Sequence, residues 1–244
     1  MTATLGEELC TCQIDDERDI ATLFADPQFS SFDHIPVRRG SSIIGVMSRE
    51  GTGTIKENLR PLDESNLISA QEPLTYLIPF LSETPYRLVL KGVSIQGIVT
   101  RSDLLKLPVR LFIFSLVTHL EMLMSEIIRA TYPDSQDDSK WLEKLKENRR
   151  KKVKAKHEEL KHRNYGLPLL ECTDFCDKRD IVNGIGRFSD EFKDDLGLIE
   201  NLRNTVAHAG NYARDDKEME KFIVCIQIAG KWIEELQNRL TNKQ

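Results

Sequence analysis

The chain contains few cysteines, and their number and spacing exclude a disulfide framework. There are five cysteines among 244 residues, an odd number, whereas disulfide-rich folds use even numbers at regular spacings. Cys10 and Cys12 are close in sequence, as are Cys172 and Cys176, but neither pair is accompanied by a second pair or by nearby histidines that would complete a four-ligand zinc set. We therefore expect free thiols in the reducing cytoplasm and no metal site.

The sequence also shows no secretion signal and no uninterrupted apolar run of membrane length. Residues 1–10 are acidic and contain neither the basic stretch nor the apolar core of a signal peptide. The most apolar run, Leu107–Ile128, includes four ionisable residues, which are Arg110, His119, Glu121 and Glu126. Because ionisable groups are costly in lipid, we expect this run to form a buried helix and not a membrane span.

The composition is typical of a soluble globular protein. Apolar residues make up 40% of the chain and charged residues 30%, and 244 residues are enough for one large core or two ordinary ones. The net charge of −5 includes one basic segment, Lys140–Arg163, with eleven lysines and arginines and four glutamates. Such a run is usually the solvated face of a helix, but its cations could also contact the phosphates of a nucleic acid.

Residues 36–51 recur without a gap 52 positions later, as residues 88–103. Six of the sixteen aligned pairs are identical: Val37/Val89, Gly40/Gly92, Ser42/Ser94, Ile43/Ile95, Gly45/Gly97 and Arg49/Arg101. Self-similarity at a fixed offset indicates that one supersecondary unit is used twice. We expect the two copies to pack together, because neither could bury its sheet alone.

Apolar patterning divides the chain near Leu107–Pro108. Before this point, short apolar runs bounded by glycines predict strands, and two stretches have helical spacing. The predicted strands are 35–37, 43–47, 88–90 and 95–100, and the predicted helices are Asp16–Phe24 and Glu72–Leu81. After it the pattern predicts helices only, at Val109–Ala130, Lys140–Arg163, Phe175–Ile185, 192–206 and 219–240. The expected fold is therefore α+β, with an α/β domain over 1–107 and an all-α bundle over 108–244.

The second copy of the repeat ends in a strand that runs into a predicted helix start, with Thr100 and Asp103 at the turn. Backbone N–H groups at a helix start favour phosphate, and a carboxylate beside them can accept hydrogen bonds from ribose hydroxyls. Thr100 as N-cap and Asp103 at the third helical position would also form an ordinary capping box, which needs no ligand. On spacing alone the capping box is the simpler interpretation.

The two copies resemble a pair of CBS motifs, the tandem module that binds adenine nucleotides in clefts between its repeats. The resemblance is carried by Ile35-Pro36-Val37 with GVMS in the first copy and by RLVL with GIVTRSD in the second. It covers about 95 residues and matches the strand and Gly-x-x-Ser/Thr-x-x-Asp signature of that family. The second copy departs from the signature at Leu88, where the family has proline.

The resemblance implies which residues would hold the nucleotide. Thr100 and Asp103 would contact ribose and phosphate, and three apolar residues would line the base; these are Ile68, Val89 and Val99. ATP, ADP, AMP or a derivative would bind as a regulator. The position of Asp103 is occupied by Gly51 in the first copy, so we expect one good site and not two.

Arg203, Asn204 and His208 form a second polar group near the end of a predicted helix. Asn204 and His208 are four residues apart and share a face, while the apolar stripe that ends at Val206 faces elsewhere. Arg203 lies about 140° round the helix from His208, so its guanidinium would have to reach around or act across a subunit boundary. The bare spacing is common by chance, and an exposed arginine with a histidine stabilising the helix C-terminus is the plain alternative.

Arg-Asn-x-x-x-His in an all-α domain, between a long first helix and a long last one, resembles the HEPN family. In that family the arginine and histidine lie at a homodimer interface and form a composite, metal-independent ribonuclease site, often in toxins or in defence against phage. The resemblance covers residues 108–244 and implies Arg203, Asn204 and His208 as the active set. An imidazole of pKa about 6.5 can move the proton of a ribose 2′-OH, and a guanidinium can stabilise charge on the phosphoryl oxygens.

Together the two resemblances predict a cytoplasmic homodimer in which an adenine nucleotide regulates a metal-independent endoribonuclease. The basic segment would then contact the RNA backbone without sequence preference. The residues expected to do so are Lys144, Arg149, Arg150, Lys151, Lys152 and Lys154. The alternative is a non-catalytic nucleotide sensor whose helical half only binds RNA or dimerises. A third alternative is a purely structural helical tail on a sensor that binds no RNA.

Overall fold

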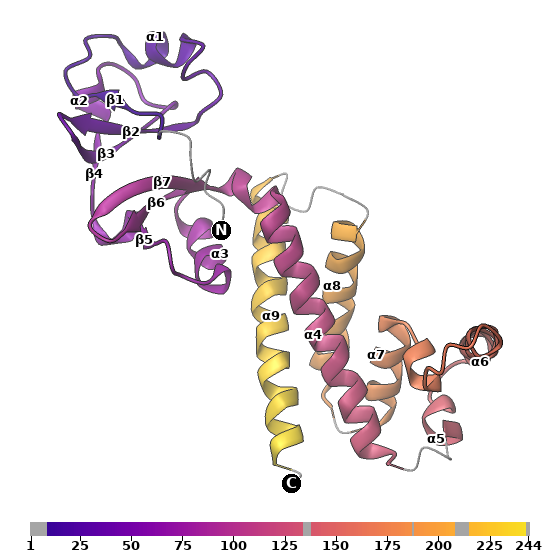
Figure 1. Cartoon of the computed structure of the whole chain (residues 1–244). Coiled ribbons are helices and arrows are strands. Elements are labelled where there is room, and N and C mark those ends of the chain that lie inside the picture. The colour runs from indigo at the N-terminus through magenta and orange to yellow at the C-terminus, as the bar shows by residue number, and fades with distance from the viewer. Residues whose placement is uncertain (1–8, 134–137, 187, 208–214, 243–244) are drawn as a thin grey trace. The chain divides into compact units, whose positions relative to one another are not determined.

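A computed structural model describes residues 9–133, 138–186, 188–207 and 215–242 (Figure 1). By its internal contacts the chain divides into two compact units, Met1–Val109 and Arg110–Gln244. The first unit contains the sheets and is mixed α and β, whereas the described part of the second contains helices. The prediction of a mixed α and β chain with a helical C-terminal half is confirmed at this level.

The first unit is built on two small sheets. The strand order is β1-β2-β3-β4 in one sheet and β5-β6-β7 in the other. The strands are β1 (Cys12–Gln13), β2 (His34–Arg39), β3 (Ser42–Ser48), β4 (Arg60–Pro61), β5 (Leu67–Ser69), β6 (Tyr86–Lys91) and β7 (Ser94–Thr100). Each sheet has one antiparallel hairpin, β2–β3 or β6–β7, with a short parallel strand beside its first member. The four predicted strands are those of the two hairpins and are confirmed.

The two hairpins have equivalent registers. His34 pairs with Ser48 at the ends of β2 and β3, and Tyr86 pairs with Thr100 at the ends of β6 and β7. Residues 34 and 86, like residues 48 and 100, are 52 positions apart. The sequence repeat is therefore also a repeat of strand pairing.

Arg49 and Arg101, which are equivalent in the repeat, make the same kind of backbone contact in both copies. Arg49 Nη2 donates to the carbonyl oxygen of Ser30 at 2.6 Å, and Arg101 Nη2 donates to that of Ser82 at 3.0 Å. Ser30 and Ser82 are also 52 positions apart. Each guanidinium thus holds the segment before its own hairpin, and this contact explains why arginine occurs in both copies.

The first hairpin separates two apolar cores. Ile35 and Met47 face one side, where they join a buried cluster with α1 (Ile20–Ala25). Val46 faces the other side and packs with Tyr86 of the second hairpin. Because successive strand residues point to opposite faces, the apolar alternation in β2 and β3 serves both cores at once.

Short helices connect the strands of the first unit. They are α1, α2 (Ile55–Asn58), α3 (Leu74–Glu83) and the 3-10 turns η1 (Glu64–Asn66) and η2 (Arg101–Leu105). The helices predicted over Asp16–Phe24 and Glu72–Leu81 are present but begin later, because Asp19 and Pro73 are extended N-cap residues. The helix start predicted at Thr100 is wrong in one respect, since η2 is a five-residue 3-10 turn and not the first turn of a longer helix.

The described part of the second unit is a bundle of helices. They are α4 (Leu107–Thr131), which begins at the end of the first unit, α5 (Asp138–Leu142), α6 (Glu147–His162), η3 (Leu169–Cys172), α7 (Phe175–Gly184), α8 (Asp190–Ala207) and α9 (Asp216–Thr241). The predicted apolar stripe on α8 is buried, and it consists of Phe192, Leu196, Ile199, Leu202 and Val206. The indole N–H of Trp232 on α9 donates to the buried carboxylate of Asp195 on α8 at 2.7 Å.

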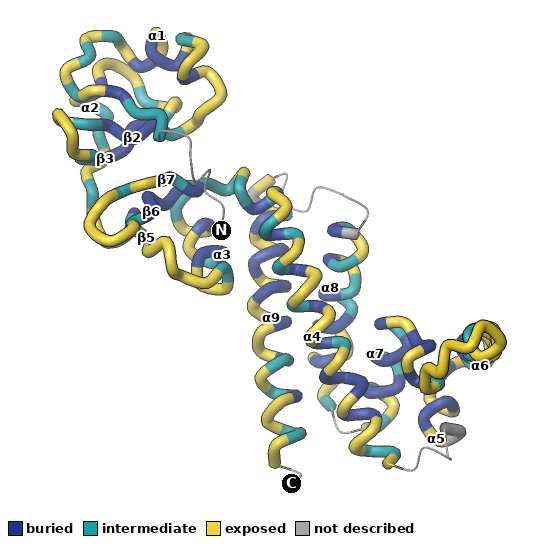
Figure 2. Tube along the Cα trace, viewed as in Figure 1, coloured by how far each residue is buried: buried dark blue, intermediate teal, exposed yellow. Residues whose placement is uncertain are grey.

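The basic segment Lys140–Arg163 forms two helices, α5 and α6, and not one. Lys146 is extended and serves as the N-cap of α6, while Trp141, Leu142 and Leu145 before it are buried. Along α6 itself Val153 is the buried residue, and most of the helix is exposed (Figure 2). The charged composition of α6 therefore corresponds to a solvated surface.

Helix α4 is the one described helix that is long and apolar enough to cross a membrane by length and composition. Of its most apolar window, 44% is buried inside the protein. Its buried side includes Ile113, Val117 and Leu120, and a core helix of a bundle has the same pattern.

Candidate functional site

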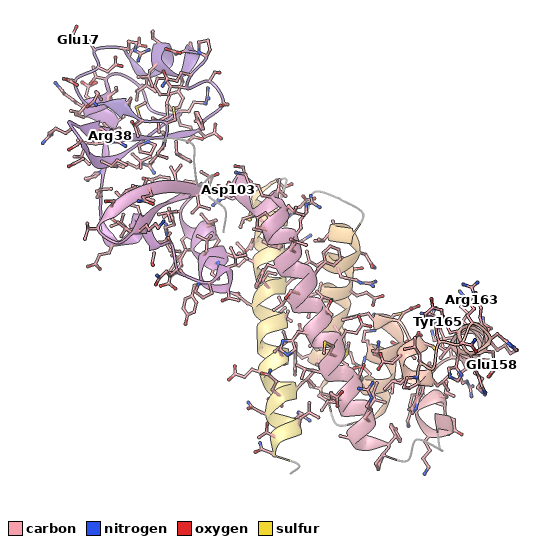
Figure 3. All side chains as sticks on the ribbon, viewed as in Figure 1. Glu17, Arg38, Asp103, Glu158, Arg163 and Tyr165 are labelled. Carbon is pink, nitrogen blue, oxygen red and sulfur yellow. The ribbon has the colours of Figure 1, made fainter. Side chains whose placement is uncertain are left out.

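A cavity of about 440 Å³ opens in the first unit beside Thr100 and Asp103. Residues of both copies line it. His34 and Pro36 come from β2, and Ile98 and Thr100 come from β7. The sequence predicted Thr100 and Asp103 as binding residues, and the structure puts both on the wall of one cavity (Asp103 is labelled in Figure 3).

The capping box considered from the sequence is present. The carboxylate Oδ2 of Asp103 accepts the Thr100 backbone N–H at 2.7 Å and the Thr100 hydroxyl at 3.2 Å. The other oxygen, Oδ1, lies 2.6 Å from Lys106 Nζ. A carboxylate has about four acceptor positions, so these contacts leave room for a ligand hydroxyl, and the capping box does not exclude a binding role.

Three further cavity residues were missed by sequence reasoning. His34 Nδ1 lies 3.0 Å from Ser48 Oγ, and burial lowers the pKa of this imidazole, which favours its neutral form. Ser102 presents a hydroxyl that lies 2.8 Å from Thr100 Oγ1. Lys106 brings a cation with a 58% exposed side chain. His34 precedes the aligned repeat, and Lys106 follows it, so the repeat could not identify either.

The three residues expected to line a nucleotide base lie elsewhere. Ile68, Val89 and Val99 are all buried. Val89 pairs with Ile68 and Gly97, so its side chain lies on the sheet face opposite to that of Ile98. These three residues are outside the lining of this cavity, so their contact with a base stays a prediction. The apolar side chains in the described lining of the cavity include Leu9, Phe32, Pro36 and Ile98.

The equivalent place in the first copy is filled by the chain itself. A Cβ added at Gly51, the counterpart of Asp103, would lie 2.6 Å from Asn58 Oδ1 and 2.8 Å from Ile20 Cδ1. A Cβ at Gly45 would lie 2.2 Å from the carbonyl oxygen of Arg60 in β4. The segment that leads through α2 to β4 therefore leaves no space for an aspartate. This observation supports the prediction of one site per chain.

The predicted catalytic residues lie on α8 as far as the structure describes it. Arg203 is half-buried, Asn204 is exposed, and Arg203 Nη1 lies 3.3 Å from Asn204 Oδ1. The carbonyl of Val206, one turn further on, is 3.5 Å from Arg110 Nη1. His208, the third member of the set, lies outside the described residues. Arg203 and Asn204 are thus adjacent and lie outside the apolar stripe of α8.

A groove runs between α8 and α9. It has a volume of about 670 Å³, and its walls include Leu198 and Thr205 from α8 and Lys221 and Val224 from α9. Leu198 and Val224 are exposed apolar residues. Arg203 and Asn204 are outside its lining.

The six predicted RNA-binding residues fall into different environments. Lys144, Lys151, Lys152 and Lys154 are exposed. Arg150 is half-buried and pairs with Glu147 at 3.2 Å.

Arg149 differs from the other five, because it connects α6 to α7. Its guanidinium contacts the carboxylate of buried Asp177 at 2.6 and 2.7 Å and that of Asp174 at 2.8 Å. This cation is therefore already neutralised by two carboxylates of its own chain.

Asp174, Cys176 and Asp177 are close enough to suggest a metal site, since their ligand atoms lie within 4.8 Å of one another. Both carboxylates, however, already contact Arg149. Burial also raises the pKa of the Cys176 thiol, which disfavours the thiolate that a metal requires. A cation at this place would have to displace the guanidinium.

No family model matches the chain, and no curated protein matches it. The two family resemblances therefore rest on the motifs in the sequence. The geometry relevant to them is the cavity beside Thr100 and Asp103 in the first unit and the exposed polar residues of α8 in the second.

Proposed function

We propose that this chain is an adenine-nucleotide-regulated endoribonuclease that acts as a cytoplasmic homodimer, in the setting of a toxin or of defence against phage. The CBS-like unit binds the nucleotide, and the HEPN-like unit cuts RNA at a composite site formed by Arg203, Asn204 and His208. The observation that carries the proposal is the cavity on whose wall Thr100 and Asp103 lie together. The presence of this cavity in one unit and of the Arg-Asn-x-x-x-His motif in the sequence of the other supports regulation of one unit by the other.

The proposed chemistry needs no metal. His208 takes the proton of the ribose 2′-OH or gives one to the leaving oxygen, and Arg203 stabilises the charge that develops on the phosphoryl oxygens. The 2′-oxygen attacks the adjacent phosphorus and the 5′-oxygen leaves, so the products carry 2′,3′-cyclic phosphate and 5′-hydroxyl ends. DNA lacks the nucleophile and should not be cut.

Cleavage of single-stranded RNA in the presence of EDTA tests this proposal. The parent protein should give cyclic phosphate ends, while Arg203→Ala and His208→Ala should each abolish cutting and leave nucleotide affinity unchanged. Lys221→Ala is a matched control, because it removes a cation from the neighbouring helix α9 and should cut like the parent. If both active-site variants cut as well as the parent, or if EDTA stops the reaction, the mechanism is wrong.

The same experiment separates the proposal from its alternative, a nucleotide sensor whose helical unit binds RNA or dimerises without cutting it. Under that alternative RNA is retained intact by the parent and by His208→Ala alike. Binding without cleavage by a freshly purified parent protein would favour the non-catalytic function.

A further inference from the structure

The cavity beside Asp103 has little positive charge. Of the described residues that line it, Asp103 and Lys106 are charged at neutral pH, and they form an ion pair at 2.6 Å. The remaining polar lining is neutral and includes Gln28, Ser31 and Ser102. The lining therefore offers a ligand one ammonium group and several uncharged hydrogen-bonding groups.

Two arginines near the cavity, Arg101 and Arg49, already make contacts within their own copies of the repeat. Arg101 follows Thr100 directly, but its Nε donates to the carbonyl of Leu81 at 2.8 Å and its Nη2 to that of Ser82 at 3.0 Å. In the first copy Arg49 donates to the carbonyl oxygen of Ser30, the counterpart of Ser82, and to that of Phe32. Moving either guanidinium to a ligand would break contacts that hold the repeat together.

The backbone at this turn also offers a phosphate limited hydrogen bonding. The turn after Thr100 is η2, a five-residue 3-10 turn, and not the first turn of a longer helix. The Thr100 N–H itself is occupied by Asp103 Oδ2 at 2.7 Å. The side chains of the lining that could contact a phosphate are the Lys106 ammonium and the hydroxyls of Thr100 and Ser102.

We infer that the cavity is selective for an adenine nucleoside monophosphate over the corresponding di- and triphosphates; this inference rests on the proposed nucleotide-sensing function. One phosphate is matched by Lys106 and two hydroxyls. A second and third phosphate add negative charge near Asp103 with no further cation among the described residues of the lining, and unpaired charge taken out of water is strongly unfavourable. The triphosphate therefore loses more free energy of hydration than it gains from contacts in this cavity.

Calorimetry on the full chain with adenosine, AMP, ADP and ATP, all in EDTA, tests the inference. AMP should bind about tenfold or more tightly than adenosine, because it adds charge-assisted hydrogen bonds to Lys106. ATP should bind about tenfold or more weakly than AMP. In Lys106→Gln the affinity for AMP should fall to that for adenosine, while the affinity for adenosine changes less than about threefold. Lys106→Arg keeps the charge and should retain part of the preference for AMP.

Lys91→Gln is the matched control, since it removes an exposed lysine of the same unit outside the cavity and should bind all four compounds like the parent. Tighter binding of ATP than of AMP would overturn the inference and leave the proposed function intact. Equal weakening of adenosine and AMP by Lys106→Gln would also overturn it. If none of the four compounds binds at millimolar concentration, nucleotide sensing and the inference both fail, while RNA cleavage remains separately measurable.

Discussion

Replacing Arg149 by alanine should destabilise the helical unit by about 2–3 kcal/mol. The substitution removes a guanidinium that contacts Asp177 at 2.6 Å and Asp174 at 2.8 Å. The Asp177 side chain is 1% exposed, so its charge would stay buried without its main partner. Breaking a fully buried pair costs roughly 3–5 kcal/mol. We expect less here, because the Arg149 side chain is 29% exposed and Asp177 keeps the hydrogen bond from the Asp174 N–H at 3.0 Å.

Tryptophan fluorescence can measure this effect in the helical unit alone, because the two tryptophans of the chain, Trp141 and Trp232, both lie there. With a urea slope of about 1–3 kcal/mol/M, the unfolding midpoint should fall by roughly 0.7–3 M. Lys151→Ala is the control on the same helix, since its side chain is 75% exposed and its loss should cost less than about 0.5 kcal/mol. Equal midpoints for Arg149→Ala and Lys151→Ala would refute the structural role of Arg149.

The dependence on pH provides an independent check of the same contact. The hydrogen bond from Arg149 lowers the pKa of Asp174. A carboxylate with a lowered folded-state pKa stabilises the fold above its unfolded-state pKa of about 3.9, and this contribution is lost as pH falls through the folded-state value. The difference in stability between the parent and Arg149→Ala should therefore be full at pH 7 and shrink below about pH 4.

Three further predictions concern the nucleotide site, its missing counterpart and the dimer. Asp103→Ala should weaken adenine-nucleotide binding about tenfold or more, since a charge-assisted hydrogen bond contributes ~1.5–3 kcal/mol; unchanged affinity by calorimetry, or two equal sites per chain, would contradict the assignment. Gly51→Ala should lower the stability of the first unit by about 1–3 kcal/mol in thermal unfolding, whereas Gly166→Ala, whose Cβ would meet nothing within 4 Å, should not. The parent should sediment as a two-fold dimer at micromolar concentration and Leu111→Glu as a monomer, because Leu111 is an exposed apolar residue of α4; a monomeric parent would rule out a composite active site.

The sequence predicted the two hairpins because each has strong local signals. Their strands are long enough to show alternation, and their turns contain Gly40 and Gly92, whose φ values of 61° and 63° favour glycine. Strands β1, β4 and β5 have two or three residues each, which is too short for any periodic pattern. Their positions depend on pairing with the hairpins, so local sequence could not predict them.

The lining of the cavity could be predicted only in part, for a similar reason. Thr100 and Asp103 lie within the repeated segment, where comparison with Ser48 and Gly51 made them conspicuous. His34 comes from the other copy and reaches the cavity only through packing of the two hairpins. The resemblance gave Ile68, Val89 and Val99 as apolar positions without their sheet face, because the face follows from register, which is a property of the folded sheet.

One short piece of chain connects the residues that line the cavity to the first long helix, α4. Through it, ligand binding in the cavity could affect the helical unit, as the proposed regulation requires. Lys106 lines the cavity and directly precedes Leu107, the first residue of α4. Its N–H donates to the Asp103 carbonyl at 3.1 Å, so a ligand that moves Lys106 acts on the start of α4 through the main chain. A coupling of ~1–3 kcal/mol would change affinity roughly 5- to 150-fold, and it must be reciprocal. AMP should therefore bind with different affinity in the presence of an RNA whose 2′-hydroxyls are methylated and which cannot be cut. Identical AMP affinities with and without that RNA would show that the two units are energetically independent.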